Sequence, residues 1–451
     1  MLLSQHEAVD LYNKVRMRAY LVCFEPTCRT KYDLADVLYQ CPRCGGLLEV
    51  EYEWQEANTS SWKETWRERR LSNGALDQSG VWRYRELLPF DGQHSVTTLR
   101  EGNTPMLEGP LAAQYAGIDR ITFKHQGFNP TGSFKDNGMS CGVSQAVRLG
   151  KHLVGCVSTG NTAASMAAYA SAAGLKPVIF LPEGNISFGK LAQALEYGAI
   201  TLQVKTNFDE ILALVRNITE AAGMYLLNSI NPFRIEGQKT MAVEMADQLE
   251  WDVPDWVVMP GGNLGNASAF GKGFLELFRL RLIDRLPRLA IIQACGSAPL
   301  YAHLQTARGT VLTAVRNPET LATAIRIGNP VSWPKALSAV EQTGGVVESV
   351  TEQEIADSKA IIGKCGIGCE PASAATLAGV KKLVARGVIR RADRIVAVLT
   401  GNLLKDPEYI YRYHTADLRT PDGAAITSTF GNKPRTVEND PDELLQYLSA
   451  I

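Results

Sequence analysis

The sequence predicts a two-lobed α/β fold, in which twisted parallel or mixed sheets carry helices on both faces. From about Ile121 the chain alternates short apolar strands with longer helical segments, and such alternation is typical of parallel sheets. Several strands are continuous runs rich in Val and Ile, as expected where both faces of a sheet are covered. With 45% hydrophobic residues among 451, the chain can bury a large core.

The alternating region supplies the expected elements in order. Nine strands are predicted at 121–124, 152–158, 177–181, 200–204, 224–227, 256–259, 289–294, 346–350 and 394–399. Helices are predicted between them, among others at 162–173, 209–222 and 236–249. The polar, Trp-rich stretch 53–80 is expected to be a connector that packs on another element, and the polar tail after Asp406 to end in a short helix at 443–449.

Four cysteines define a separate module near the N-terminus. Cys23, Cys28, Cys41 and Cys44 lie within residues 20–52 and resemble a zinc ribbon. The Cys41-Pro-Arg-Cys44-Gly-Gly knuckle suits tetrahedral thiolate geometry, although the first pair is more widely spaced than usual. The pattern favours a structural zinc over four packed thiols, and such a closed site stabilises its module without taking part in chemistry.

The composition excludes several classes of protein. Lys plus Arg number 46 against 47 Asp plus Glu, so no global field attracts nucleic acid or an anionic membrane. No run of 18 apolar residues predicts a membrane span, and residues 1–10 lack the layout of a signal peptide. Nine cysteines, four of them clustered, favour a reducing cytoplasm over a disulfide framework.

A lysine marks the first of four unusual turns between a strand and a helix. In Gly132-Ser-Phe-Lys-Asp136 the lysine, Lys135, falls in the first helical turn. The positive end of the helix dipole disfavours a cation there, which lowers the cost of the proton loss that a Schiff-base lysine requires. An isolated lysine near a helix start is more often a solvated surface residue, so this interpretation depends on the other turns.

Two further turns are suited to anions. Ser158-Thr-Gly-Asn-Thr162 opens a helix of small residues, where hydroxyls, an amide and backbone N–H groups converge. Gly262-Asn-Leu-Gly-Asn266 follows a strand, and its glycines let successive N–H groups form a nest for a phosphate monoester. Taken alone, the first turn is more readily explained as a simple N-cap, and the second is explained equally well as an ordinary turn.

The fourth turn, Leu399-Thr-Gly-Asn402, ends the last strand, and its Thr400 hydroxyl can bond a ring nitrogen without giving it a full charge. Together the turns supply a lysine, a phosphate nest, an amide and a hydroxyl at strand ends that one sheet can gather. These are the groups that an aldehyde cofactor with a phosphate needs.

With these residues, the chain from about Glu101 to Asp406 resembles the threonine synthases, which belong to the tryptophan-synthase-β-like, fold-type II group of pyridoxal phosphate enzymes. Segments 228–240 and 323–330 resemble threonine synthases in particular, whereas the lysine and asparagine loops are common to the group, including serine/threonine dehydratases. The matching segments are 101–105, 132–136, 158–165, 228–240, 262–266, 323–330, 370–374 and 399–402.

The resemblance implies a role for each matching residue. Lys135 is the Schiff-base lysine that also moves protons, Asn161 bonds the phenolic oxygen of the cofactor, and Thr400 faces its ring nitrogen. The cofactor phosphate is implied to bind Gly262, Asn263, Leu264, Gly265 and Asn266. The carboxylate and phosphate of the substrate are implied to bind Ser158, Thr159 and Thr162, and the phosphate also Asn228, Ser229, Arg234 and Asn263.

The implied reaction is that of a carbon–oxygen lyase acting on a phosphate. O-phospho-L-homoserine loses its phosphate by β,γ-elimination and gains water to give L-threonine. Arg234 is expected to select the phosphorylated substrate, because its planar fork binds a phosphate bidentately. The alternative for Arg234 is a surface arginine paired with Glu236.

Three rival functions stay open. A serine/threonine dehydratase has no need for Arg234, and a cysteate-synthase-like enzyme shares the phosphate anchor but uses another nucleophile. A zinc-ribbon protein that binds nucleic acid predicts a basic stripe, which the net charge of −1 disfavours. No nucleic-acid or membrane partner is therefore expected.

The resemblance also implies the domain order and the assembly. The predicted units are the zinc-ribbon-like module 1–60, the first part of a large cofactor domain at 61–145, a smaller nested domain at 146–235, the second part of the large domain at 236–410, and the tail 411–451. The group usually forms homodimers. One departure from its pattern is the sequence Thr400-Gly-Asn-Leu-Leu, where a second glycine is expected before the leucine.

Overall fold

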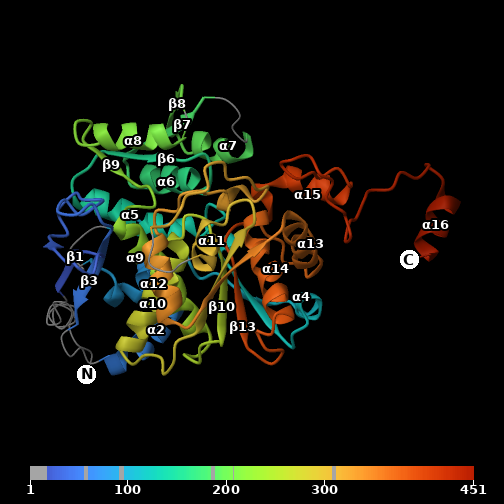
Figure 1. Cartoon of the computed structure of the whole chain (residues 1–451), viewed down its shortest axis with the longest axis horizontal. Helices are drawn as coiled ribbons and strands as arrows, with labels where there is room; N and C mark the ends of the chain where they lie inside the picture. Colours follow the sequence, from blue (N-terminus) through green and yellow to red (C-terminus); the bar gives the residue numbers. More distant parts are fainter. Residues whose placement is uncertain are drawn as a thin grey trace.

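The structure is a computed structural model, which describes residues 18–54, 59–90, 96–183, 188–206, 208–306 and 311–450. Three sheets lie side by side with their helices (Figure 1). The predicted lack of a signal peptide concerns residues 1–10, which lie outside the described part of the chain. Among the described residues, no helix is both long and apolar enough to span a membrane.

The larger sheet has six strands in the order β12-β11-β10-β13-β5-β4. Its strands are β4 (Met106–Glu108), β5 (Ile121–His125), β10 (Trp256–Pro260), β11 (Arg288–Ala294), β12 (Val346–Val350) and β13 (Ile395–Leu399). All pairs are parallel except the edge pair of β4 with β5. Every residue of β10 and β13 is buried, which confirms the prediction of strands covered on both faces.

The two faces of this sheet carry different helices. Val257 and Met259 of β10 belong to a core cluster with α9 (Pro232–Gln248), α10 (Gly265–Arg279) and α12 (Trp333–Gln342). The neighbouring Trp256 and Val258 belong to a second cluster with α4 (Pro110–Ala116), α13 (Glu352–Lys364) and α14 (Pro371–Ala385). Because side chains of a strand alternate between faces, one apolar run serves both cores.

The smaller sheet has four parallel strands in the order β8-β7-β6-β9. They are β6 (Leu153–Val157), β7 (Lys176–Pro182), β8 (Ile200–Val204) and β9 (Met224–Leu226). The helices around this sheet are α5 (Lys135–Arg148), α6 (Asn161–Ala172), α7 (Phe188–Glu196) and α8 (Phe208–Ile218). The helices α5 and α9 pack on each other and so join the two sheets.

The N-terminal module is a three-stranded antiparallel sheet of β1 (Arg18–Cys23), β2 (Lys31–Tyr32) and β3 (Leu48–Glu53). It contacts both larger units. The Lys335 amine of α12 donates to the Leu48 carbonyl at 2.6 Å. On the other side, the Gln145 amide of α5 donates to the Leu34 carbonyl at 2.8 Å, and the Tyr39 hydroxyl accepts the backbone N–H of Leu226 at 2.7 Å.

All nine predicted strands are present, with ends that differ by at most two residues. One expectation needs correction. The predicted helix 236–249 begins four residues earlier, at Pro232, because the Asn231 side chain caps it by accepting the N–H of Phe233. The connector packs on another element, as predicted: it contains the helix α2 (Trp62–Leu71), whose Trp66 is fully buried in the core cluster with α9 and α10. The division into domains stays a prediction.

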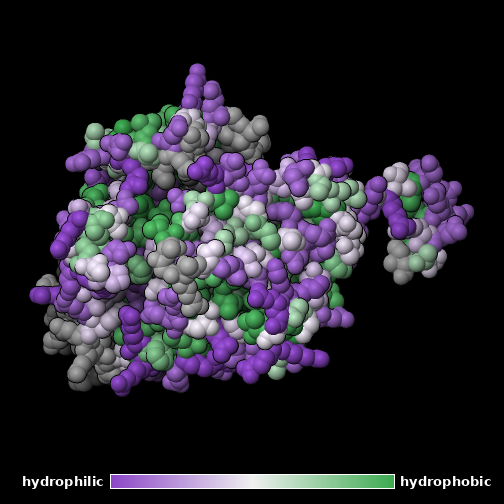
Figure 2. Space-filling view, viewed as in Figure 1, coloured by the Kyte–Doolittle hydropathy of each residue, from purple (hydrophilic) through white to green (hydrophobic). Residues whose placement is uncertain are grey.

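The tail extends away from the rest of the chain (Figure 1). The helix α15 (Pro407–His414) still packs on α13, and the chain then ends in α16 (Pro441–Ser449), close to the predicted helix. Figure 2 shows α16 as a separate body that carries hydrophobic residues. Leu444, Leu445 and Leu448 are 40%, 64% and 62% exposed, so this helix has an unpartnered apolar side.

Candidate active site

Lys135 is the first residue of α5, as the sequence predicted. The preceding turn leaves β5 and is held against the end of β13: Ser133 forms an isolated bridge with Gly401, and the Phe134 N–H bonds the Thr400 carbonyl at 3.0 Å. Asp136 accepts the Thr131 N–H at 2.7 Å and the Ser165 hydroxyl at 2.6 Å. The lysine turn is thus fastened to the last strand and to α6.

The Lys135 amine is positioned to be neutral near physiological pH. Burial, and then the charge of Arg234, lower the pKa of Lys135 to about 7. The Lys135 amine lies over the Phe134 ring in a cation–π interaction, 4.1 Å from the ring centroid. A neutral amine is the form that attacks an aldehyde.

The glycine-rich turn lies where β10 meets α10. Leu264 adopts a left-handed conformation with φ 64°, and the helix begins at Gly265. Among the described residues, the backbone N–H groups of Gly262, Asn263 and Leu264 have no hydrogen-bond partner. A Cβ on Gly262 would lie 3.0 Å from the Ala324 carbonyl oxygen. The turn therefore presents free N–H donors in a space that segment 323–330 closes, as an anion site requires.

Asn263 ties this turn to the same segment. Its side-chain oxygen accepts the Val331 N–H at 2.7 Å, and its carbonyl accepts the Ser332 N–H at 3.3 Å. Both side-chain polar atoms of the buried Asn266 lack a partner within the described chain. Unpaired buried amides are costly, so Asn266 points to a polar ligand at this position.

A carboxylate that the sequence did not single out joins two predicted residues. Glu370 is 1% exposed and precedes α14. One of its oxygens accepts the Asn161 amide, and the other accepts the Thr400 hydroxyl, both at 2.9 Å. The Thr400 hydroxyl also lies 3.0 Å from that of Ser373. Glu370 was part of a matching segment, but its contacts are 209 and 30 residues away, and no local pattern reveals them.

The predicted substrate-binding residues line the ends of two neighbouring strands. Ser158 and Thr159 follow β6, and Thr162 lies in the first turn of α6. Asn228 and Ser229 follow the adjacent β9, and the Asn228 amide bonds both the N–H and the carbonyl of Val157 at 3.0 Å. That pairing joins the two strand ends and leaves one Asn228 N–H for a ligand.

Arg234 lies in the first turn of α9 and is 1% exposed. One of its terminal nitrogens donates to the Leu227 carbonyl at 3.1 Å, and its Nε has no partner in the part of the chain that the structure describes. Burial lowers the pKa of Arg234 to about 10, so it stays charged at neutral pH. The surface pairing with Glu236 is wrong, because Glu236 binds Lys239 and Lys272 instead.

The departure after Thr400 is accommodated locally. The residues Leu403–Lys405 form a short 3-10 turn, which the Asn402 side chain caps by accepting the Leu404 N–H at 3.0 Å. The Asn402 N–H bonds the Gly132 carbonyl at 2.9 Å. The turn thus supports the lysine loop without the expected second glycine.

These residues fit a phosphorylated aldehyde cofactor. Among the buried polar atoms that lack a partner within the described chain are the side-chain oxygen of Asn161, the two side-chain atoms of Asn266 and the Nε of Arg234. They lie on the turns that also carry Lys135 and the free N–H groups of 262–264. Buried polar atoms of this kind require a bound group, and an aldehyde with a phosphate would engage both the lysine and the nest.

Known proteins carry the same sequence pattern. A family model described as pyridoxal-phosphate dependent enzyme matches residues 97–401. Threonine synthases from Methanocaldococcus jannaschii and Methanosarcina acetivorans are 47% identical over 386 residues and 46% identical over 392. The matches cover 85% and 87% of this chain and 93% of each relative. The chain belongs to the threonine synthases of the pyridoxal-phosphate dependent family. It is therefore a lyase-type enzyme of fold-type II that uses pyridoxal phosphate.

Solved structures support the fold of this threonine synthase family member. Maize serine racemase matches with a TM-score of 0.56 and 20% identity, over 67% of this chain and 89% of that one. A threonine deaminase from T.th. matches with a TM-score of 0.56 and 24% identity, over 67% and 92%. At these low identities the two structures establish only the fold. The assignment to the threonine synthases, and not to the deaminases, rests on the sequence relatives.

Glu370 gives a prediction for cofactor binding. The variant Glu370→Gln is expected to weaken the affinity for pyridoxal phosphate about tenfold or more. A glutamine side chain has only one oxygen, so it cannot accept the hydrogen bonds of both Asn161 and Thr400. Each hydrogen bond to a charged group contributes about 1.5–3 kcal/mol. A visible-absorbance titration of the apoenzyme measures this. The exposed Glu341 offers the control Glu341→Gln, and equal affinity in both variants would contradict the role of Glu370.

The four predicted metal ligands come together. The sulfurs of Cys23, Cys28, Cys41 and Cys44 all lie within 4.8 Å of one another. Two of the separations are 3.4 Å for Cys23 to Cys44 and 3.7 Å for Cys28 to Cys41. A tetrahedral zinc with bonds of about 2.3 Å places its sulfurs about 3.8 Å apart, so the cluster is compatible with zinc. Among the described residues, no other cluster of this kind is found.

Metal removal gives a second prediction. Chelation, or Cys41→Ser, is expected to lower the melting temperature by about 5 °C or more, because metal-binding free energy contributes to folding. Elemental analysis should find one zinc per chain in the wild type. The control Cys295→Ser alters an exposed thiol outside the cluster. An unchanged melting temperature in a zinc-free Cys41→Ser protein would contradict a structural metal.

Proposed function

We propose that this chain converts O-phospho-L-homoserine and water into L-threonine and phosphate, with the residues predicted above as its site. The observation that carries the choice of substrate is Arg234. Its side chain is a buried cation whose Nε has no partner among the described residues, and its charge lowers the pKa of the Lys135 amine. Such an arginine supports recognition of a substrate phosphate beside the reacting carbons.

Each group of the site has its own role in the proposed reaction. Pyridoxal phosphate supplies an electron sink for the carbanion formed at the α-carbon. The neutral Lys135 amine takes the α-proton, and its position lets it move protons at the neighbouring carbons. Arg234 and the free N–H of Asn228 hold the phosphate that leaves. The hydroxyls of Ser158 and Thr159 bind the substrate carboxylate at the positive end of α6.

Glu370 and the lysine turn position these groups. Glu370 holds Asn161 and Thr400 in place from opposite ends of one carboxylate. The Gly262–Asn266 turn binds the cofactor phosphate through backbone N–H groups. Water must reach the β-carbon after the phosphate departs. The buried residues around the site limit the access of larger nucleophiles to that carbon.

A product assay tests this function. Purified holoenzyme is mixed with O-phospho-L-homoserine, and phosphate and L-threonine are followed together. Equal amounts of both products support the proposal. Phosphate without threonine would indicate another nucleophile, as in a cysteate-synthase-like enzyme. A keto acid formed from L-threonine, without turnover of the phosphorylated substrate, would indicate a dehydratase.

We also infer a cytoplasmic homodimer that binds no nucleic acid. The clustered free thiols support a reducing compartment, and the balanced charge supports the absence of a nucleic-acid partner. The exposed leucines of α16 support contact with a second copy. Light scattering of the full chain and of a chain ending at residue 434 tests the assembly. A monomeric full chain would contradict the homodimer.

A further inference from the structure

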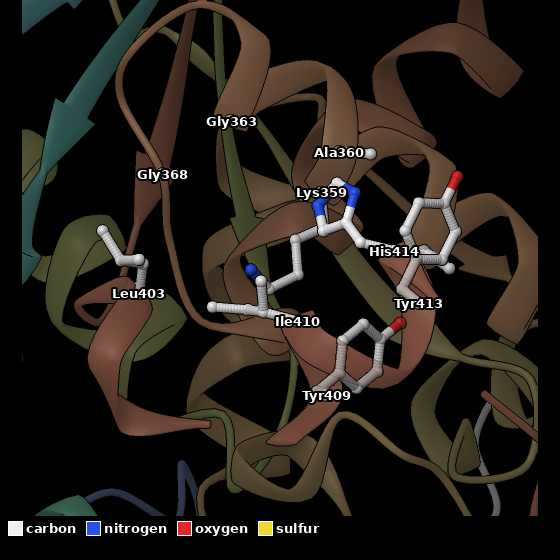
Figure 3. A pocket seen from close by; sticks show the side chains of 10 residues that line it. Lys359, Ala360, Gly363, Gly368, Leu403, Tyr409, Ile410, Tyr413 and His414 are labelled. Carbon is white, nitrogen blue, oxygen red and sulfur yellow. The ribbon is translucent and has the colours of Figure 1, made fainter. Parts of the chain in front are cut away.

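A cavity lies between α13 and α15. It has a volume of about 90 Å³, and Figure 3 shows the side chains that line it. Polar groups come from Lys359, Tyr409, Tyr413 and His414, and the other lining residues are Ala356, Ala360, Gly363, Gly368, Leu403 and Ile410. No carboxylate is among these ten residues.

Lys359 is a cation without a counterion in this cavity. Its residue is 8% exposed, and within the described chain its amine has no hydrogen bond or salt bridge. In Figure 3 its amine extends between Ile410 and Leu403. Burial lowers the pKa of Lys359, and the negative charges of Asp406 and Glu370, which do not line the cavity, oppose this. A largely buried cation without a hydrogen-bond partner is costly, and an anion in the cavity would lower that cost.

Two hydrogen-bond donors complete the cavity. The Tyr409 hydroxyl is buried without a partner among the described residues, on a residue that is 7% exposed. The His414 Nδ1 accepts the N–H of Asn432 at 3.0 Å, so the neutral ring carries its proton on Nε2 and can donate. Burial, and then the charges of Lys359 and Lys364, lower the pKa of His414. These groups therefore form a positive, donor-rich environment.

We propose that this cavity binds a small oxyanion, a carboxylate or a phosphate, through Lys359, Tyr409 and His414, and that its occupancy is linked to the cofactor site. The volume exceeds the roughly 10–15 Å³ that a single water molecule requires, so the cavity has room for an anion of four or five heavy atoms. One cation and two neutral donors match the acceptors of such an anion. This site is distinct from the substrate phosphate site at Arg234.

The linkage follows from two shared wall residues. The carbonyl of Gly368 accepts the His125 Nε2–H at 2.8 Å, and His125 ends the strand that leads into the lysine turn. Leu403 packs closely on Gly368, where an added Cβ would lie 2.8 Å from the leucine side chain. Gly368 is two residues before Glu370, whose N–H bonds the Gly401 carbonyl at 3.1 Å. An anion that orders Gly368 and Leu403 acts on both walls of the cofactor site.

Calorimetric titration of the holoenzyme with sodium phosphate and with sodium acetate tests the proposal, with sodium chloride at equal ionic strength as reference. The background Arg234→Met removes phosphate binding at the substrate site. In that background, Lys359→Met is expected to weaken oxyanion binding at least about tenfold. Tyr409→Phe should weaken it severalfold and leave folding intact. Lys176→Met, which removes an exposed lysine of β7 that does not line the cavity, should bind as the parent does.

The outcomes are distinct. Equal affinity in the parent and in Lys359→Met, or no binding of either anion, would overturn the oxyanion site. Binding of phosphate alone or of acetate alone would support it and identify the source of the oxyanion. Saturation without any change in the absorbance or fluorescence of the bound cofactor would overturn the linkage. None of these results depends on whether the enzyme makes threonine.

Discussion

Replacing Lys135 by alanine is expected to lower kcat by about 10⁴-fold or more, since proton transfer by a positioned base contributes about 10²–10⁴-fold and the covalent hold on the cofactor is lost as well. Lys135 is buried, and Arg234 and the Phe134 ring are near its amine. No second described lysine occupies the turn. Phosphate release and the visible absorbance of the cofactor measure the effect.

Two controls separate chemistry from folding in this experiment. The exposed Lys176 at the start of β7 offers Lys176→Ala as a matched variant, which should keep full activity. Added ethylamine should restore part of the lost rate to Lys135→Ala, because a small amine can enter the space of the deleted side chain. Full activity of Lys135→Ala would contradict its catalytic role.

Replacing Arg234 by methionine is expected to lower kcat/KM for O-phospho-L-homoserine about 10³-fold, since two charge-assisted hydrogen bonds to a phosphate contribute about 1.5–3 kcal/mol each. The same change removes a buried charge without a carboxylate partner. The variant should therefore be at least as stable as the wild type in thermal unfolding. Loss of activity together with loss of stability would contradict a role confined to substrate binding.

The Arg234→Met variant also predicts a shift in pH dependence. The charge of Arg234 is the second cause, after burial, that lowers the pKa of Lys135 to about 7. Removing a neighbouring positive charge raises the pKa of an amine. The rate at which apoenzyme takes up pyridoxal phosphate should rise with pH through about 7 in the wild type, and at a higher pH in Arg234→Met. Coincident profiles would show that the two groups do not interact.

Much of the fold and of the cofactor site followed from the sequence because the signals are local. A buried parallel strand is a continuous apolar run, and the turn after it carries its polar residues within a few positions. Lys135, the 262–266 turn and Thr400 were therefore found as residues at strand ends. The four cysteines were predictable for the same reason, since their spacing is a property of one short segment.

The remaining features depend on contacts between distant segments. The sequence contains Glu370, but only the tertiary structure places its carboxylate between Asn161 and Thr400. It contains Arg234, but whether that side chain is paired at the surface or buried near Lys135 was decided by the packing of α9 against α5. Lys359 likewise looks like an ordinary helix lysine until α15 covers it. Local patterns determine elements and turns, whereas burial and charge partners arise only when elements far apart in the sequence pack together.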